Sequence, residues 1–162
     1  MIHKVLDSFV QDEAQAHCDV PCGIYDPHLA QVAALTVIRM VDLMNDLVAT
    51  HKEQDLEFRN SVVRYVNVKE EHAELCKREV RVIFGDYIKK EHIDKFPELP
   101  ELAHKIYQAG SKARQTASRA NALELLTLVN RFAEIFWATK GVATKVAKAP
   151  YKPSEEVVYP VL

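Results

Sequence analysis

The chain has 162 residues, of which 48% are hydrophobic and 27% are charged, so it is long enough to bury the core of one domain. Its net charge is −2 with acidic and basic residues interspersed, which argues against a nucleic-acid surface, because such a surface normally shows a basic stripe. No apolar run approaches the roughly 18 residues that a membrane-spanning helix needs. We therefore expect a single domain with no nucleic-acid partner and no membrane anchor, located in the cytoplasm.

The first sixteen residues end in Ala14-Gln15-Ala16, which imitates a signal-peptidase site. This segment also carries Asp7, Asp12 and Glu13, and it lacks the continuous apolar stretch of a secretory signal. The composition predicts that residues 1–16 are a propeptide that is removed on maturation. Export is the alternative interpretation.

The segment that follows brings an imidazole, two thiols and a phenol close together in the sequence. If the chain is cut before His17, the new amino group, the Cys18 backbone nitrogen and the Cys18 sulfur can hold one metal ion in two fused five-membered chelate rings. Cys22 is four residues further on, with Pro21 bending the chain, so its sulfur can complete a planar site of two nitrogens and two sulfurs. The imidazole of His17 is placed for an axial fifth position. This donor set favours nickel(II) or copper(II) over zinc, which prefers a tetrahedron.

Two long helices are predicted next. Asp26 followed by Pro27 is typical of a helix start, and apolar residues recur at helical spacing from there to about residue 48. A polar break at residues 50–55 precedes a second amphipathic helix, which we expect to continue to about Tyr87.

Two further helices and a tail complete the chain. The third helix carries apolar residues at 102–107 and is expected to be interrupted at Gly110 and Ser111, and a fourth runs from about residue 116 to residue 139. Four amphipathic helices with short connections predict an all-α, antiparallel up-and-down four-helix bundle with an N-terminal metal-binding hook. Residues 142–162 contain three prolines and show no helical period, so we expect a loosely ordered tail there.

Other metal or thiol chemistry finds little support in the sequence. A di-iron centre in a bundle needs two Glu-x-x-His motifs, and only Glu101 with His104 matches. One match among 23 acidic residues and seven histidines is about what chance gives. The third cysteine, Cys76, lies in an amphipathic run and is interpreted as a small buried apolar residue.

At residues 17–25 the chain closely resembles the nickel superoxide dismutases, whose mature proteins begin with His-Cys-Asp-x-Pro-Cys-Gly-x-Tyr and bind nickel through this hook. Four downstream segments extend the resemblance, and these are residues 69–75, 84–89, 95–99 and 136–141. The resemblance therefore spans about residues 17–141 and implies that the hook and the bundle form one domain over this range.

The resemblance implies dismutation of two superoxide anions to oxygen and hydrogen peroxide, an antioxidant activity in which one nickel ion per subunit cycles between nickel(II) and nickel(III). It implies that His17, Cys18 and Cys22 hold the metal, and that Tyr25 and Asp19 control access of the substrate and help to deliver protons. It also implies a homohexamer whose neighbouring subunits cover the hook, and a maturation peptidase as a partner.

The outer residues of the site are less closely matched. Tyr87 and Lys89 resemble family positions near the metal approach, with simple packing and a solvated charge as the alternatives. Family members carry a glutamate and an arginine that steady the axial imidazole, where this chain has Ala33 and His72. A histidine can still form a hydrogen bond to that imidazole, whereas an alanine cannot.

Two other functions use the same residues and stay open on the sequence alone. A nickel or copper trafficking module would use the same ligands but release the metal readily. A purely structural helical protein with oxidisable cysteines would bind no metal at all.

Overall fold

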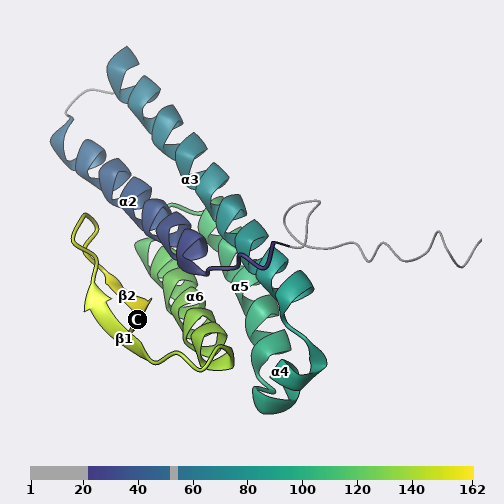
Figure 1. Ribbon diagram of the computed structural model, residues 1–162. Helices are drawn as coiled ribbons and strands as arrows, with labels where there is room; N and C mark the ends of the chain where they lie inside the picture. Colours follow the sequence, from purple (N-terminus) through teal and green to yellow (C-terminus); the bar gives the residue numbers. More distant parts are fainter. Residues whose placement is uncertain (1–21, 52–54) are drawn as a thin grey trace, which may run out of the picture.

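The computed structural model describes residues 22–51 and 55–162. Its four long helices are α2 (His28–Thr50), α3 (Leu56–Val82), α5 (Leu99–Gln115) and α6 (Arg119–Thr139). They run alternately in opposite directions (Figure 1), and each packs against two neighbours, because α2 and α5 both contact α3 and α6. This arrangement confirms the predicted antiparallel four-helix bundle.

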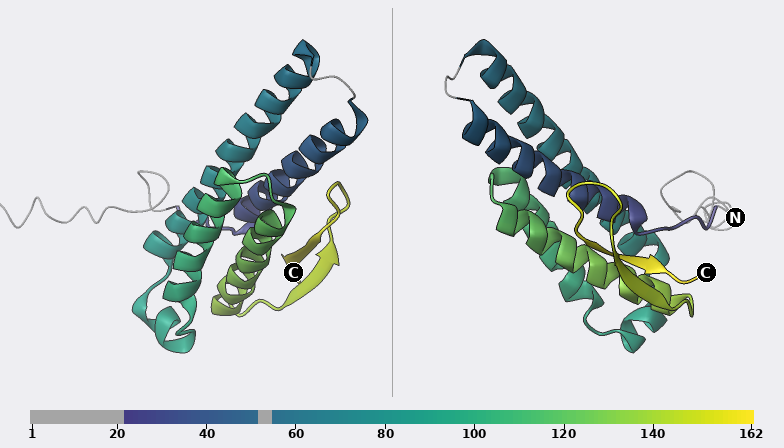
Figure 2. Two further views of the ribbon diagram at one scale, coloured as in Figure 1. Left: turned by 180° about the vertical axis from the view of Figure 1, so that it is seen from behind. Right: turned by 90° about the vertical axis from the view of Figure 1, so that its left-hand side faces the viewer.

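All four long helices contribute to one hydrophobic core. The largest fully buried side chains are Phe132, Phe136, Ile38, Leu99, Ile106, Leu125 and Ile135. The C-terminal half of α2 and the N-terminal half of α3 extend beyond α5 and α6 (Figures 1 and 2). For this reason Phe58, Val62 and Tyr65 of α3, which have helical spacing typical of a core face, are only half-buried. Among the residues that the structure describes, no helix has the length and apolar character needed to cross a membrane.

Helix α3 ends in a wider turn before the chain reverses. Its first turn is capped by Asp55, whose side chain accepts a hydrogen bond from the Phe58 backbone N–H at 2.8 Å. At its other end the helix passes into a π-helical turn, η1 (Ile83–Tyr87), which closes with a bond of 3.1 Å from Ile88 N to Ile83 O. Such turns are rare and often lie at functional sites. The short helix α4 (Lys90–Lys95) then leads to α5.

Helix α5 is continuous, so the predicted interruption at Gly110 and Ser111 is wrong. The Ser111 hydroxyl donates to the Tyr107 carbonyl oxygen at 3.0 Å within the helix and does not break it. A Cβ atom at position 110 would lie 2.7 Å from Cγ of Lys77 on α3. Glycine therefore serves the close approach of α3 to α5 here, at a cost in helix propensity that the packing offsets.

A buried lysine closes the C-terminal end of α5. The Lys69 side chain is 3% exposed, and its Nζ donates to the carbonyl oxygens of Ala113 and Thr116, each at 3.1 Å, and to that of Arg114. The last carbonyls of a helix have no partner within the helix, so a cation there satisfies them and interacts favourably with the helix dipole. Burial lowers the pKa of Lys69, and the neighbouring Glu70 carboxylate opposes that shift.

The segment after α6 differs from the prediction, because residues 142–162 are not a loose tail. They contain a hairpin of β1 (Thr144–Lys148) and β2 (Glu156–Pro160), paired antiparallel with Val146 opposite Val158. The hairpin lies over α2 and α6 (Figure 2), and Val157 and Val158 are buried. Helical period alone misses this element, since β-branched and aromatic residues in a short run are typical of a strand.

Polar side chains fasten the hairpin to the bundle. The buried Gln31 of α2 donates through Nε2 to the Val158 carbonyl oxygen at 2.9 Å and to Asn130 Oδ1 at 3.0 Å. Arg119 forms a second anchor, because its guanidinium contacts Asp42 at 2.8 Å and Glu155 at 2.5 Å. The hairpin is thus attached at β2 and at its turn.

We predict that Lys69→Met destabilises the fold by about 1–3 kcal/mol, because it leaves buried carbonyl groups at the end of α5 without a donor. Lys112→Met is the matched control: Lys112 is exposed and its ion pair with Glu124 is a surface contact, worth under about 1 kcal/mol. Denaturant unfolding of both variants at neutral pH measures the difference. Equal losses of stability in the two variants would contradict the capping role.

Candidate metal centre

The predicted metal ligands are divided between described and undescribed residues. His17, Cys18 and Asp19 lie outside the residues that the structure describes. Cys22 is the first described residue, and its side chain is exposed. Gly23 follows with φ of +68°, a left-handed conformation that side chains rarely adopt, so this position of the hook requires glycine.

The hook is connected to the bundle by a fixed stretch of backbone. The Asp26 carboxylate accepts a hydrogen bond of 2.8 Å from the His28 backbone N–H, and Pro27 is buried. The Pro27 carbonyl oxygen accepts from the Gln31 backbone N–H at 3.2 Å and begins the hydrogen bonding of α2. These contacts set the direction in which the chain enters the first helix.

The structure brings together two of the predicted site tyrosines. The rings of Tyr25 and Tyr87 lie with their centroids 5.5 Å apart and their planes tilted by 42°. Tyr87 is the last residue of the π-helical turn, and Tyr25 is three residues after the exposed thiol of Cys22. The aromatic contact therefore holds the described part of the hook against the end of the bundle.

Tyr87 is itself surrounded on several sides. The ring of His92 stacks on it with centroids 5.2 Å apart, and the ring of Phe136 lies 5.1 Å away in a tilted arrangement. Its hydroxyl is 2.8 Å from Oγ1 of Thr139, and Nζ of Lys140 lies 4.5 Å from the ring centroid. An ammonium at that distance from an aromatic face is attracted by the ring quadrupole.

The lysine over Tyr87 is therefore Lys140, which sequence reasoning did not assign to the site. The predicted Lys89 is exposed, and its backbone N–H donates to Nδ1 of His92 at 3.0 Å. This backbone contact fixes the imidazole that stacks on Tyr87. Thr139 and Lys140 lie within segment 136–141, which resembles the family. That segment alone does not indicate that these two residues contact Tyr87.

The two positions that depart from the family pattern lie on neighbouring helices. Ala33 is buried on α2 and has no polar side-chain atom. His72 is half-buried on α3, and its Nδ1 lies 2.9 Å from the Val68 carbonyl oxygen of the same helix. Because a carbonyl only accepts, Nδ1 carries the hydrogen in this contact, and a neutral His72 has Nε2 as its acceptor.

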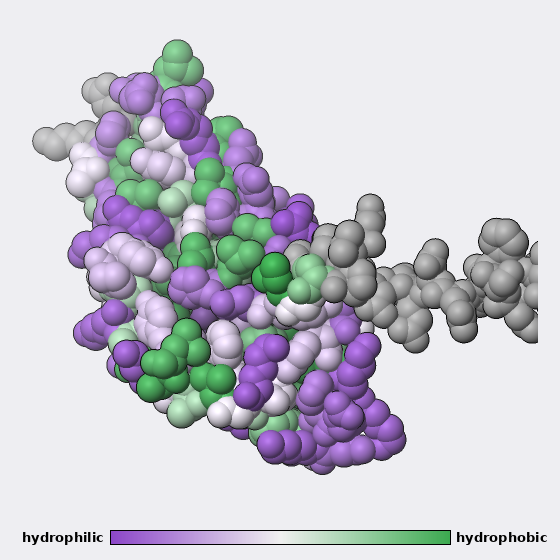
Figure 3. All heavy atoms as spheres, viewed as in Figure 1, coloured by the Kyte–Doolittle hydropathy of each residue, from purple (hydrophilic) through white to green (hydrophobic). Residues whose placement is uncertain are grey.

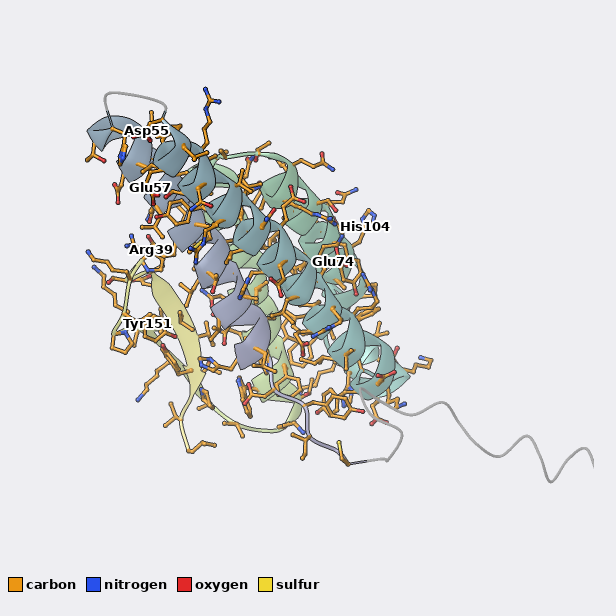
Figure 4. All side chains as sticks on the ribbon, turned by 90° about the horizontal axis from the view of Figure 1, so that it is seen from above. Arg39, Asp55, Glu57, Glu74, His104 and Tyr151 are labelled. Carbon is orange, nitrogen blue, oxygen red and sulfur yellow. The ribbon has the colours of Figure 1, made fainter. Side chains whose placement is uncertain are left out.

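The competing sites find no support in the described part of the chain. Cys76 is fully buried, and burial raises the pKa of its thiol to about 12, so this cysteine stays protonated and unreactive. His104 is exposed on α5 (Figure 4), and the Glu101 carboxylate pairs with Lys105 at 2.7 Å. Within residues 22–51 and 55–162, no group of three or more histidine, cysteine or acidic side chains could hold a metal ion.

The donor chemistry that remains fits nickel. The exposed Cys22 thiol stands outside the core, at the N-terminal edge of the described chain, and the other soft and nitrogen donors precede it directly in the sequence. The described surroundings are aromatic and cationic, without a carboxylate cluster that would favour magnesium or calcium.

Comparison with known proteins points to one family. A family-wide sequence profile described as nickel-containing superoxide dismutase matches residues 12–140. A superoxide dismutase [Ni] of Streptomyces seoulensis is 35% identical over 130 residues, which cover 79% of this chain and 91% of that protein. Its counterpart in Streptomyces coelicolor is 35% identical over 125 residues, covering 77% and 88% of the two chains.

Solved structures agree with the sequence comparison. A native nickel superoxide dismutase structure matches with a TM-score of 0.66 and 35% identity, covering 76% of this chain and 99% of the other. A structure of nickel-containing superoxide dismutase with nickel ligation of the oxidised state matches with a TM-score of 0.67 and 34% identity, covering 77% and 99%. The C-terminal hairpin at 144–160 lies beyond the residues that the family profile matches.

Proposed function

Because this chain belongs to the nickel-containing superoxide dismutase family, we propose that its N-terminal hook binds one nickel ion per subunit and that the protein converts superoxide to oxygen and hydrogen peroxide. The observation that carries the proposal is the match over residues 12–140, since this range contains the complete set of ligands, His17, Cys18 and Cys22. In the structure, Tyr25, three residues after Cys22, packs on Tyr87 at the end of the π-helical turn, which supports a site at that end of the bundle.

His17, Cys18 and Cys22 would hold the metal through two thiolates, the N-terminal amine, a deprotonated backbone amide and the imidazole of His17. When bound, nickel supplies one-electron chemistry between nickel(II) and nickel(III), which thiolate and amide ligands favour because they donate electron density. Sulfur ligation also accounts for the choice of cysteine where a purely structural turn would accept other residues.

The remaining residues must attract an anion and supply protons. Two superoxide anions take up two protons in total: one anion loses an electron and leaves as oxygen, and the other gains that electron and both protons to become hydrogen peroxide. Tyr25 and Asp19 are placed in the sequence to order water or the anion by hydrogen bonding. The ammonium of Lys140 over Tyr87, together with the exposed Lys89, adds positive charge that raises the local concentration of superoxide.

His72 would give the His17 imidazole the polar support that Ala33 lacks. With its Nδ1–H donating to the Val68 carbonyl oxygen, the neutral ring keeps Nε2 as an acceptor, which would accept the N–H of the His17 imidazole directly or through a water molecule. Ala33 cannot take part in this support. The chain would therefore steady the imidazole with one polar group where its relatives use two.

Maturation follows from the ligand chemistry. Before cleavage the nitrogen of His17 is an amide within a peptide bond, which is a poor donor, so the chelate cannot close. We propose that a peptidase removes residues 1–16 and leaves residues 17–141 as the hook and bundle domain, to which the C-terminal hairpin is added. The family profile begins at residue 12 and so includes the proposed cleavage point. The cytoplasmic location stays a prediction.

Apolar residues near the hook support the proposed homohexamer. Ile24 is 72% exposed and Leu29 is 59% exposed, and both lie within seven residues of Cys22. Hydrophobic residues also gather on the face of the molecule that Figure 3 shows, next to the atoms drawn in grey. A neighbouring subunit on this surface would bury these side chains and cover the hook.

We expect the mature protein to sediment with the mass of six subunits, and Leu29→Lys to shift it toward smaller species, because a charge would be buried in the interface. Val146→Lys is the matched control, since Val146 is a similarly exposed residue on the outer hairpin. Analytical ultracentrifugation at micromolar concentration measures both variants. A monomeric wild-type protein would rule out the hexamer, and equal shifts in both variants would place the interface elsewhere.

A nickel or copper trafficking protein would use the same ligands, and dismutase turnover distinguishes it from the proposed enzyme. We predict that Cys18→Ser and Cys22→Ser each abolish dismutase activity while the bundle stays folded, because the hook precedes the core. Cys76→Ala is the matched control and should retain activity, since Cys76 is fully buried in the core and is not one of the proposed ligands. Superoxide decay, nickel content and far-ultraviolet circular dichroism are measured together. Substantial turnover in either hook variant would remove the two-thiolate site.

A further inference from the structure

The hydrogen bonds around Thr139 determine the direction in which the Tyr87 hydroxyl points. Oη of Tyr87 lies 2.8 Å from Oγ1 of Thr139, and the same Oγ1 lies 2.6 Å from the carbonyl oxygen of Phe136. A carbonyl oxygen can only accept, and a threonine hydroxyl has one hydrogen, so Thr139 donates to Phe136. Thr139 must then accept from Tyr87, and the phenol hydrogen is directed into the C-terminal end of α6.

The ring of Tyr87 is held as firmly as its hydroxyl. His92 stacks on it with planes 19° apart, and Phe136 and Tyr25 lie against it at 5.1 and 5.5 Å between centroids. The imidazole of His92 is itself fixed, because its Nδ1 accepts the Lys89 backbone N–H. Rotation of the phenol away from Thr139 would therefore break both the hydrogen bond and the aromatic packing.

We propose that Thr139 is a positioning residue for the superoxide reaction: it holds the Tyr87 phenol so that its oxygen can accept further hydrogen bonds but cannot donate them. This inference rests on the proposed function and deepens it. A superoxide anion needs donors, so it gains no hydrogen bond from this oxygen. Water and hydrogen peroxide do donate, and Tyr87 would orient them.

The two tyrosines consequently have different roles. The Tyr87 oxygen orients a proton-bearing molecule, so that the proton-delivering water keeps its other hydrogen for the reduced oxygen species. Donation to the anion itself falls to other groups of the site, with Tyr25 the nearest phenol. Without the Thr139 acceptor, the Tyr87 hydroxyl would be able to turn and donate, and water would lose its fixed orientation.

Two substitutions test the hydrogen bond separately from the packing. Thr139→Val keeps the shape of the side chain but removes the acceptor, whereas Thr139→Ser keeps the hydroxyl. We expect Thr139→Val to lower kcat at least about 10-fold, within the range typical of residues that support a metal site, with nickel content unchanged. Thr139→Ser should stay close to wild type. Equal losses in the two variants, or no loss in Thr139→Val, would overturn the proposal.

A double-mutant cycle shows whether the effect passes through Tyr87. In a Tyr87→Phe background the phenol is absent, so adding Thr139→Val should cause no further loss. A second loss as large as that in the wild-type background would mean that Thr139 acts independently of Tyr87. If Thr139→Val does not fold, as judged by far-ultraviolet circular dichroism, Thr139→Ala takes its place in the cycle.

A measurement without nickel keeps this inference distinct from the proposed function. The near-ultraviolet circular dichroism of the nickel-free chain contains a contribution from Tyr87, defined by subtracting the spectrum of Tyr87→Phe. Thr139→Val should reduce that contribution, because the ring is then held by its aromatic neighbours alone, and Thr139→Ser should retain it in full. If wild-type protein shows no dismutase activity, the proposed function fails, while an unchanged Tyr87 contribution in Thr139→Val would refute the positioning itself.

Discussion

The packing of Tyr25 against Tyr87 is the contact through which the folded bundle holds the described end of the proposed metal-binding segment. Three proposed ligands within six residues cannot fix their own orientation, because so short a segment has little apolar surface to bury. The bundle supplies the missing rigidity. Tyr87 is placed by the π-helical turn at the end of α3 and tied to α6 through Thr139, so two helices that lie far from Tyr25 in the sequence determine where Tyr25 packs.

Two further residues fix how α3 packs against α5. Lys69 satisfies the carbonyl groups at the end of α5, and Gly110 lets α3 and α5 approach each other. Both devices act on α3, the helix that leads into the π-helical turn. Each one has an energetic cost, because a buried charge loses its hydration and a glycine lowers helix propensity, and each one fixes the position of that helix.

The sequence predicts the local features well. Helical periodicity identifies the four long helices, and the spacing of His17, Cys18 and Cys22 predicts a metal hook, because both depend on residues close together in the chain. Long-range features escape it. The hairpin at 144–160 owes its order to Gln31 and Arg119, which come from other elements, and the neighbours of Tyr87 on α6 are more than forty residues away. The strands of this hairpin are also short, and they lie among prolines and lysines, so an alternation of apolar and polar residues along them is easily missed.

The central claim is that a free amine at His17 completes a redox-active nickel site, and superoxide decay in two forms of the chain tests it most directly. One form begins at Met1 and the other at His17; both are loaded with nickel and followed by stopped-flow absorbance, with mass spectrometry to confirm that neither is cleaved further. The account predicts rapid decay with the His17 form only, accompanied by a nickel(III) paramagnetic signal. Equal activity in the uncleaved Met1 form, or nickel binding without any turnover in the His17 form, would contradict it.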